Sequence, residues 1–539
     1  MQFAGTAIMD TAEQQSRMDG SGVTTGAWIA VRIAAGEAIV DGMHRAAFGH
    51  RLGAPDVVDA DGIFAEWDWD GRRLVVCNDR YGLQPLFHAS LPGGGIAVSP
   101  SIARLIGLGA SAALDPEALA IFFRFGYFLG EDTPFQSIRA VPPKAVFEWA
   151  NGKLTCRARY PPVPEEAHLT RDDAIDRYTE LFAVSIAKRL PASARFGVTL
   201  SGGRDSRHIV LELHRQGFRP QACVSALDHP PDPNEDPEVA AALCARLGLR
   251  HVIVAQQLSR FAAEAHKNRR THFCAMEHGW YLALADFLDG RFECVLDGIA
   301  GDVHSQSKFL TPVLDTAFHS GNLHAICDAL FARHASNLAG AESLLKGKLR
   351  ACLDPDTARR RLARELGRHL DCPNPVASFV FWNRTRREIA LAPFGILQGV
   401  PTVYAPYLDH DLFDFTVSLP SRMLLNRRFH DDVIARAYPA CADIPYARNA
   451  APHSDDRRQR VRFLGEAARK FLLRRPSRLM KNVEPRARML VGALSRGLVS
   501  TWVPPLIVYL DQLETLIREP VKRSACAADH ATRPRTRVT

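Results

Sequence analysis

Short apolar runs and longer amphipathic segments alternate between residues 196 and 298. The runs are short and rich in β-branched residues, whereas the segments between them repeat their apolar residues at helical spacing. This alternation is typical of a parallel sheet whose connecting helices cover its faces. The expected strands are FGVTL (196–200), ACVSAL (222–227), HVIVA (251–255) and ECVLDG (293–298), and the expected helices are 206–217, 236–248 and 278–290.

The chain before this pattern predicts a different architecture. Residues 62–100 alternate apolar and polar side chains, with turn sequences at Asp70-Gly71 and at the glycines 93–95. This pattern indicates short antiparallel strands. We therefore expect a β-rich first domain over residues 1–158.

A proline-containing connector, residues 159–173, separates the two patterns. Its prolines prevent regular structure, and Thr170 is placed to cap a new helix with Asp173 at the third position. We expect a second domain over residues 170–450, mainly helical beyond residue 311.

The last part of the chain, residues 451–539, is expected to be a basic helical extension with a disordered tail at 525–539. Residues 456–488 carry much of the basic excess behind the net charge of +8. A basic face can attract nucleic acid or anionic lipid, but no aromatic residues interleave here as a stacking platform would require. We expect a solvated helical face, without a nucleic-acid or membrane partner.

Length and composition indicate a multidomain globular protein. At 539 residues the chain is long enough for two or three domains. It contains no apolar stretch of about 18 residues that could cross a bilayer, and its first residues lack the layout of a signal peptide. Eleven cysteines without a C-x-x-C pair fit reduced thiols. We expect a cytoplasmic protein.

The sequence LSGGRDSR (200–207) lies where the first expected strand of the second domain passes into a helix. In an open parallel sheet, ligands collect at such carboxyl ends. Gly202 and Gly203 can take positive φ and keep Cβ atoms away, so that backbone N–H groups converge on an anion beside a helix N-terminus. Ser201 and Ser206 would add hydroxyl donors.

Asp205 would repel a bare phosphate, and it fits the turn if a divalent cation lies between carboxylate and phosphate. A second carboxylate at a strand end, Asp302 in VLDGIAGD (295–302), could share that cation. The pair predicts a metal-assisted nucleotidyl transfer site. The Walker A pattern is absent, which disfavours a P-loop NTPase. The alternative is a plain strand-to-helix turn with Asp205 as a capping residue.

Four stretches in this order resemble the asparagine synthetase family. LSGGRDS resembles the S-G-G-x-D-S loop of the ATP pyrophosphatase (PP-loop) enzymes, and LDGIAGD (296–302) is similar to the family's S-G-E-G-x-D-E. NDRYGLQPLF (78–87) is similar to D-R-x-G-x-x-P-L, and YAPYLDHDLFDFTVSLP (404–420) to R-x-P-F-L-D followed by L-P. Together they span about residues 62–440.

The resemblance implies an α/β protein with two activities. An N-terminal Ntn-hydrolase-like α+β domain would free ammonia from glutamine, and a Rossmann-like parallel-sheet PP-loop domain would adenylate a carboxylate and form an amide. The cofactors implied are ATP and Mg²⁺. By resemblance, the ATP contacts are Leu200, Ser201, Gly202, Gly203 and Ser206, with Val224, Asp297 and Gly298 near the adenosine and Asp205 and Asp302 as catalytic magnesium ligands.

The chain departs from the family in its first domain. Family amidotransferases use a cysteine directly after the initiator methionine, whereas this sequence has Gln2, and its first cysteine is Cys77 in an expected strand. No R-G-P-D or N-G-E glutamine-binding segment occurs. We expect a degenerate glutaminase domain, so that free ammonia or an amine would be the nitrogen donor.

The second domain departs as well. Ile299 replaces the glutamate of S-G-E-G-x-D-E, and Val303 replaces its last acid. Residues 425–438 lie where the family carries a lysine that stabilises the transition state. This stretch contains His430, Asp431 and Asp432, with Arg427 and Arg428 just before them. An arginine could supply the positive charge, with Arg428 as the expected catalytic cation, and Lys308 is another candidate.

Three further stretches could be functional. His272, Cys274 and His278 form a possible zinc set, although on a helix only the last two share a face. Glu277 could approach a nucleotide. His304 could touch substrate, with a supporting or core role favoured, and the aromatic run 121–128 is expected to be helix core.

Three functions remain open at this point. The favoured one is an AMP-forming amide ligase that joins a small-molecule or peptide carboxylate to an amine or ammonia. A homodimer is possible. Relatives in this family without the cysteine include β-lactam synthetase and lasso-peptide cyclases. The second is an ATP-binding pseudo-synthetase that acts as a partner in a biosynthetic cluster. The third is a PP-loop tRNA-modifying enzyme, which the DRYGLQPLF segment disfavours.

Overall fold

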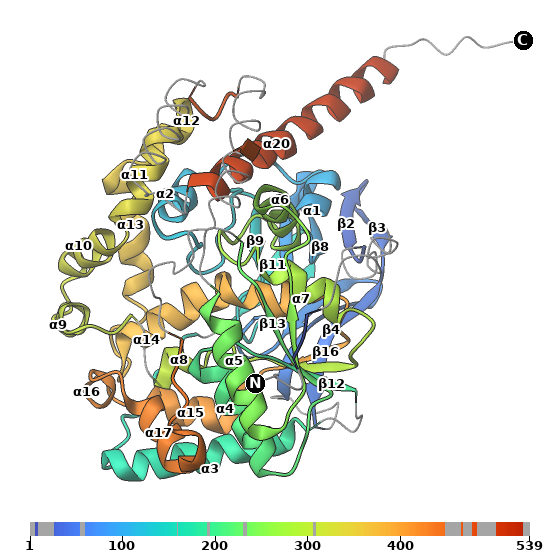
Figure 1. Cartoon of the computed structure of the whole chain (residues 1–539). Coiled ribbons are helices and arrows are strands. Elements are labelled where there is room, and N and C mark those ends of the chain that lie inside the picture. Colours follow the sequence, from blue (N-terminus) through green and yellow to red (C-terminus); the bar gives the residue numbers. More distant parts are fainter. Residues whose placement is uncertain are drawn as a thin grey trace, which may run out of the picture.

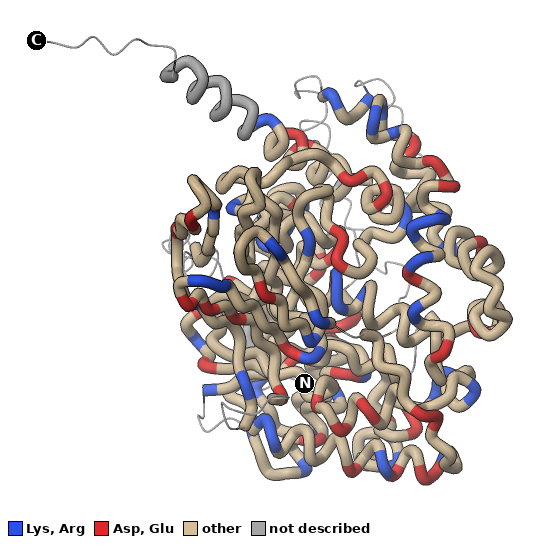
Figure 2. The backbone as a smooth tube through the Cα atoms, turned by 180° about the vertical axis from the view of Figure 1, so that it is seen from behind, with Lys and Arg blue, Asp and Glu red and all other residues tan. Residues whose placement is uncertain are grey.

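The structure is a computed structural model of the 539-residue chain. None of the helices that it describes is both long and apolar enough to span a bilayer. Positive and negative side chains are interspersed over the described backbone (Figure 2). The described residues are 6–8, 26–53, 60–158, 160–190, 195–229, 234–305, 309–447, 465–466, 477–481 and 503–531.

The N-terminal half is built on two antiparallel sheets, as the alternating pattern of residues 62–100 predicts (Figure 1). The first has the order β3-β2-β8-β7-β9 and the second the order β11-β10-β6-β5-β4. Hairpin turns join β5 to β6 at Asp70 and β7 to β8 at residues 92–94. The strands are β2 (Ile29–Ala34), β3 (Glu37–Gly42), β4 (Arg45–Leu52), β5 (Asp61–Trp69), β6 (Arg73–Asn78), β7 (Phe87–Leu91), β8 (Gly95–Ser99), β9 (Ile138–Ala140), β10 (Val146–Ala150) and β11 (Lys153–Arg157).

Apolar side chains of the two sheets meet in one core, to which Val31, Val98, Trp67 and Val76 contribute. Helices α1 (Ile102–Gly107) and α2 (Pro116–Phe125) pack on the other face of the first sheet. The aromatic run 121–128 is core, as expected: the rings of Phe122 and Phe128 stack with centroids 4.6 Å apart.

The second half contains the predicted parallel sheet, with the order β1-β14-β13-β12-β15-β16. The four strands expected from the sequence are all present, and each pairs in parallel with its neighbour. Two outer strands come from distant segments, β1 from the N-terminus and β16 from beyond residue 400. The strands are β1 (Thr6–Ile8), β12 (Phe196–Thr199), β13 (Ala222–Ala226), β14 (His251–Val254), β15 (Cys294–Leu296) and β16 (Thr402–Tyr404).

The helices of this half follow the predicted alternation. Thr170 caps the first of them: its hydroxyl accepts the Asp173 N–H at 3.2 Å, as the sequence predicts. The helices are α3 (Arg171–Lys188), α4 (Arg204–Arg215), α5 (Glu235–Leu247), α6 (Arg260–Arg270), α7 (Tyr281–Leu288) and α8 (Gly301–Ser305).

Beyond residue 311 the chain is mainly helical, as expected, and α9 to α13 form one flank of the molecule (Figure 1). Its elements are α9 (Pro312–His319), α10 (Leu323–Arg333), α11 (Ala335–Leu344), α12 (Gly347–Ala351), α13 (Pro355–Leu366), α14 (Pro375–Val380), the π-helix η3 (Phe381–Thr385), η4 (Ile389–Leu391), the π-helix η5 (Ala392–Ile396), η6 (Pro406–Leu408), α15 (His410–Ser418), α16 (Ser421–Leu424), α17 (Phe429–Ala437) and η7 (Pro439–Cys441).

The C-terminal helix α20 (Val503–Ala531) corrects one expectation. The sequence assigns residues 525–539 to a disordered tail, but the helix continues through Ala531. Its last turns contain alanines, which favour helix strongly. The first turns bury Leu506, Tyr509 and Leu513 against the body, while the far end projects from it (Figure 1). Most of the basic segment 456–488 lies outside the described residues, and the domain boundaries 158, 170 and 450 remain predictions.

Asp79, in the first of the four family-like stretches, organises the turn after β6. Its side chain is 0% exposed, and its carboxylate accepts backbone N–H groups of Phe64, Tyr81, Leu83 and Gln84 at 2.8–3.4 Å. Burial raises the pKa of Asp79 to about 6, against the opposing effect of these donors. The carboxylate therefore satisfies backbone groups that would otherwise be buried without partners.

The same stretch joins the two halves of the chain. The Arg80 guanidinium bonds to the Asp414 carboxylate, and the ring of Tyr81 lies 4.8 Å from that of Phe413, both on α15. The first and last of the family-like stretches are therefore in contact, and one apolar core continues from Tyr81 into the parallel-sheet half.

Replacing Asp79 by Ala should lower the free energy of unfolding by at least about 2 kcal/mol, because several buried amides lose their acceptor. Urea denaturation followed by circular dichroism measures this. Asp70→Ala is the control, since Asp70 also accepts two backbone N–H groups but lies in an exposed hairpin turn; its loss should stay below about 1 kcal/mol. Equal losses in the two variants would contradict this reading of Asp79.

Candidate functional site

The parallel sheet reverses its strand order between β12 and β15. From β12 the chain proceeds outward through β13 to β14, and it returns to the other side of β12 with β15. Val198 of β12 is in register with Leu296 of β15. The segments after both strands, 200–206 and 297–302, therefore leave the sheet side by side, at the place where open α/β sheets bind ligands.

The glycine turn folds back on itself with its donors already partnered. The Ser201 N–H donates to Ser206 Oγ at 3.0 Å, and the Gly203 N–H donates to Ser201 Oγ at 3.2 Å. The Gly202 N–H donates to the carboxylate of Asp236, at the start of α5, at 3.1 Å. Hydroxyl and carboxylate oxygens thus occupy the donors that an anion would otherwise use.

The reason for the glycines differs from the one expected. Neither Gly202 nor Gly203 has positive φ, so the left-handed conformation is not required. A Cβ on Gly202 would instead lie 2.6 Å from the Cβ of Ala447 and 2.7 Å from Asp236 Oδ1. Close approach of two other segments, rather than backbone conformation, therefore requires glycine at position 202.

Asp205 and Asp302, predicted from the sequence to act together, are brought together by the fold. The Asp302 N–H donates to Asp205 Oδ2 at 3.0 Å, across 97 residues of sequence. Gly298 and Gly301 allow this approach, since a Cβ on them would lie 3.0 Å from the Asp205 Cβ and 2.5 Å from its Cγ. Ala300 between them takes φ of +72°, a conformation uncommon outside glycine.

The electrostatics of the pair fit a cation. Asp205 Oδ1 is buried and has no hydrogen-bond partner among the described residues. Burial raises the pKa of Asp205 well above its usual value, and the negative charge of Asp302 raises it further. Two adjacent carboxylates with an unpartnered oxygen are the ligand type that Mg²⁺ prefers. These residues could hold a divalent cation.

His430, on α17, contacts the unpartnered oxygen and was not assigned a role from the sequence. Its Nδ1 lies 3.4 Å from Asp205 Oδ1 and 3.0 Å from the hydroxyl of Ser305, on α8. Its Nε2 lies 3.1 Å from His208 Nδ1, on α4. Burial lowers the pKa of His430 to about 3, so the ring is neutral. No local sequence signal places position 430 beside position 205.

The other predicted nucleotide contacts lie around this pair. Leu200 and Val224 are buried in the core, and the Leu200 N–H donates to the Val224 carbonyl at 2.9 Å. Asp297 accepts the hydroxyls of Thr199 and Tyr281, each at 2.7 Å, so its carboxylate already has structural partners. Gly298 packs against Asp205.

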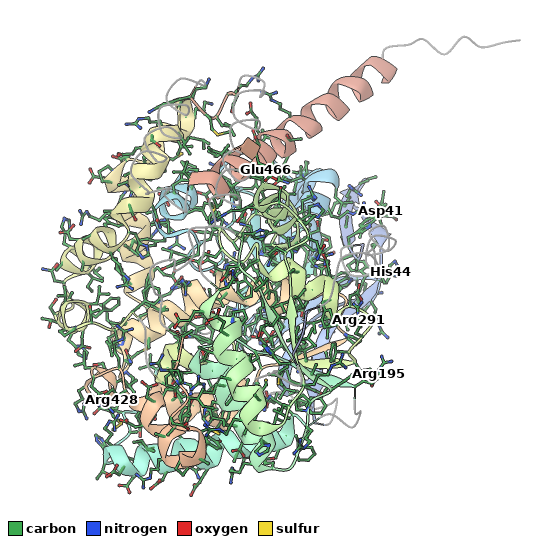
Figure 3. The ribbon with its side chains drawn as sticks, viewed as in Figure 1. Asp41, His44, Arg195, Arg291, Arg428 and Glu466 are labelled. Atoms are coloured by element: carbon green, nitrogen blue, oxygen red, sulfur yellow. The ribbon has the colours of Figure 1, made fainter. Side chains whose placement is uncertain are left out.

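The predicted catalytic cation, Arg428, lies apart from the pair. Its side chain is 72% exposed, and its guanidinium is 3.6 Å from Asp432, one helical turn ahead. It lies near the outer edge of the molecule (Figure 3). Arg428 is the N-cap residue of α17, and its side chain faces solvent. In the described part of the chain, no contact joins it to Asp205 or Asp302. Lys308 lies outside the described residues.

Other arginines lie closer to the carboxylate pair. Arg204, next to Asp205 in the turn, donates from its Nε and Nη2 to the carboxylate of Asp431. Arg384, on η3, bonds to Glu277 at 2.9 Å; it is largely buried, and carboxylates that include Asp302 raise its pKa despite that burial. These cations come from segments that the sequence does not align with the turn.

Ile299 and Val303, where the family pattern has acids, are buried in the apolar core. Ile299 keeps one backbone bond of the turn, since its N–H donates to Asp297 Oδ1 at 2.9 Å. The substitutions therefore replace charge with packing at these two positions.

The possible zinc set is wrong. Residues 272–278 are not helical, and His272 and His278 have positive φ. No group of three or more metal-binding side chains is found among the described residues. His272 and Cys274 are buried and His278 is half-buried, and the ring of His272 packs 5.4 Å from that of Phe87.

Two further candidates have clear environments. His304 is buried between the rings of Phe381 and Phe413, at 4.9 and 5.1 Å, which is the core role favoured from the sequence. Glu277 forms an ion pair with Arg384, and the same arginine interacts electrostatically with Asp302.

Comparisons with known proteins agree with this geometry. Residues 46–160 match the family described as glutamine amidotransferase domain, and residues 177–303 match asparagine synthase. Curated proteins of Mycobacterium bovis and Mycobacterium tuberculosis, named "Putative asparagine synthetase (glutamine-hydrolyzing)", are 28% identical over 209 residues. That segment is 37% of this chain and 32% of each relative, so the match spans about a third of the relatives' length.

The order of the two matched domains is the order that the four stretches predict. The first covers the antiparallel sheets from β4 onward, and the second covers the glycine turn and both aspartates. The two matched domains, in this order, together with the curated relatives, support the asparagine synthetase family for this chain.

Proposed function

We propose that this protein is an ATP-dependent, AMP- and pyrophosphate-forming ligase that adenylates a carboxylate and joins it to an amine or ammonia. The observation that carries the proposal is the half-buried pair of Asp205 and Asp302 beside the glycine turn, with one buried oxygen of Asp205 that lacks a hydrogen-bond partner among the described residues. A divalent cation bound by both carboxylates would offset their repulsion, and a cation in that place would meet the phosphates of a nucleotide.

The glycine turn supplies the groups that would bind the triphosphate. Leu200, Ser201, Gly202, Gly203 and Ser206 would contact it, because their N–H and hydroxyl groups surround the N-terminus of α4. Ser201 and Ser206 currently bond to each other, at 3.1 Å between the hydroxyl oxygens, and rotation about their Cα–Cβ bonds would turn them to a phosphate. Val224, Asp297 and Gly298 would border the adenosine.

Asp205 and Asp302 would hold the magnesium ion, which offsets the charge of the departing pyrophosphate. Arg204 and Arg384 are better placed than Arg428 to stabilise negative charge at the reacting phosphorus, because both act electrostatically on the aspartate pair.

The reaction balances without a further reagent. The substrate carboxylate oxygen attacks the α-phosphorus of ATP, and the bond to pyrophosphate breaks. The amine nitrogen then attacks the acyl carbon, AMP leaves with the electron pair, and the nitrogen loses a proton. Adenylation is needed because a free carboxylate is a poor electrophile.

We propose further that the first domain does not hydrolyse glutamine. The first cysteine of the sequence, Cys77, lies within β6. Burial raises the pKa of its thiol, and the charge of Glu66 raises it further, so the thiolate is disfavoured. The nitrogen donor would then be free ammonia or a substrate amine, although the relatives' printed names describe glutamine-hydrolysing enzymes.

A second function is favoured by two observed substitutions. Ile299 and Val303 place buried apolar side chains where the family pattern has acids. An ATP-binding partner protein without turnover could tolerate this loss. Retention of the aspartate pair favours the ligase, because a scaffold has no need of two buried carboxylates at a nucleotide site.

Asp205→Asn should lower ATP–pyrophosphate exchange by at least about 100-fold, because the amide removes one of the two charges that would hold the cation. The measurement is an exchange screen over carboxylate candidates with AMP as the monitored product. The control is Asp328→Asn, which removes an exposed partner of Arg359 and should leave exchange unchanged. Wild-type protein that exchanges with no carboxylate, yet binds ATP, would favour the pseudo-synthetase instead.

Glutamine should not serve as nitrogen donor, because the sequence offers no activated thiol in the first domain. With an accepted carboxylate, ammonium or an amine should support AMP formation, while glutamine should yield no glutamate above background. Cys77→Ser is the matched variant and should behave as wild type. Glutamate release that disappears in Cys77→Ser would overturn the assignment.

A further inference from the structure

Three helices meet at the unpartnered oxygen of Asp205. Asp205 and His208 lie on α4, Ser305 lies on α8 with Asp302, and His430 lies on α17. His208, Ser305 and His430 are buried completely and form a continuous chain of polar contacts. We call these three residues the buried chain His208–His430–Ser305.

The direction of the hydrogen bonds in this chain can be deduced from one end. Ser305 donates its only hydroxyl proton to the carbonyl of Gly301. Its oxygen must therefore accept at its contact with His430 Nδ1, 3.0 Å away. The proton of that hydrogen bond then belongs to His430, so Nδ1 carries it.

The other end of the chain gives the same assignment. His208 Nε2 is buried without a hydrogen-bond partner among the described residues, so the proton of that ring lies on Nδ1 rather than on an unpartnered Nε2. His208 Nδ1 therefore donates to His430 Nε2, 3.1 Å away, and His430 Nε2 is the acceptor. The proton of the His430 ring then lies on Nδ1. A single tautomer of each ring satisfies every contact.

The same Nδ1–H group of His430 lies 3.4 Å from Asp205 Oδ1. That oxygen accepts no hydrogen bond from the described residues, so the His430 Nδ1–H is available to it at this distance, while Oδ2 is fixed by the Asp302 N–H. A neutral donor restrains a carboxylate without cancelling its charge, whereas a lysine or arginine there would compete with a bound cation. The Asp205–Asp302 pair therefore keeps its charge for a metal ion.

We propose that His430 is a positioning residue of the metal site: its Nδ1–H, fixed by Ser305 and His208, sets the rotamer of Asp205 so that its carboxylate and that of Asp302 can share one divalent cation. The inference rests on the proposed function. It ties α17, whose His430 lies 125 residues beyond Ser305 in the sequence, to the geometry of the ATP site.

The test uses two substitutions that separate shape from hydrogen bonding. Asn places its side-chain N–H near the position of His Nδ1, whereas Leu fills similar space without a donor. The full-length protein is titrated with Mn²⁺ in the presence of a non-hydrolysable ATP analogue. His430→Leu should weaken Mn²⁺ by about 10- to 100-fold, and His430→Asn should recover most of that loss.

The matched control is His304→Leu. His304 is equally buried and lies on the same helix as Asp302, but its ring packs between Phe381 and Phe413, and it has no hydrogen bond to Asp205. Its Mn²⁺ affinity should equal that of wild type. Circular dichroism of each variant identifies a folding defect, and ¹⁵N NMR of the wild-type histidines tests the Nδ1–H tautomer of His430 without any substitution.

Five outcomes overturn the inference. Mn²⁺ affinity that is unchanged in His430→Leu removes the positioning role, as does an equal loss in His430→Asn or in His304→Leu. A wild-type His430 with its proton on Nε2 removes it directly. Wild-type protein that binds the analogue but no Mn²⁺ overturns the proposed function together with this inference, and so is distinguishable from failure of His430 alone.

Discussion

The site depends on holding two like charges together. Asp205 and Asp302 repel each other, yet the Asp302 N–H bonds to Asp205, and glycines at 298 and 301 remove the side chains that would keep them apart. Their burial makes the repulsion costly in the absence of a cation, which is why the pKa of Asp205 rises. The surrounding fold enforces this contact. The reversed strand order brings the two segments together, and α17 packs against them.

The first domain packs against the second part of the chain through the turn after β6. Asp79 forms the turn after β6, and the adjacent Arg80 and Tyr81 contact Asp414 and Phe413 on α15. The apolar core continues across this junction. A domain that had lost its chemistry would still be retained if the second half needs this packing to fold.

The departures from the family pattern concentrate on charge. Ile299 and Val303 exchange acids for buried apolar groups, while a neutral histidine, His430, lies against the free oxygen of Asp205. Arg204 and Arg384 carry positive charges that act on Asp205 and Asp302, respectively. The charge distribution around the two aspartates therefore differs from the one that the family pattern implies.

The sequence alone determined the parts that depend on local pattern. Alternating periodicities predicted the antiparallel strands, the parallel sheet and its helices, and Thr170 predicted the start of α3. These elements depend on side chains that are close together in the sequence. Glycines and acids after two strands were enough to pair Asp205 with Asp302. Only the tertiary structure decided that Arg428 faces solvent, that His430 reaches Asp205, that close packing against Ala447 rather than positive φ requires Gly202, and that β1 and β16 complete the sheet. These contacts join residues up to hundreds of positions apart, and no local preference encodes which distant side chain will fill a given space.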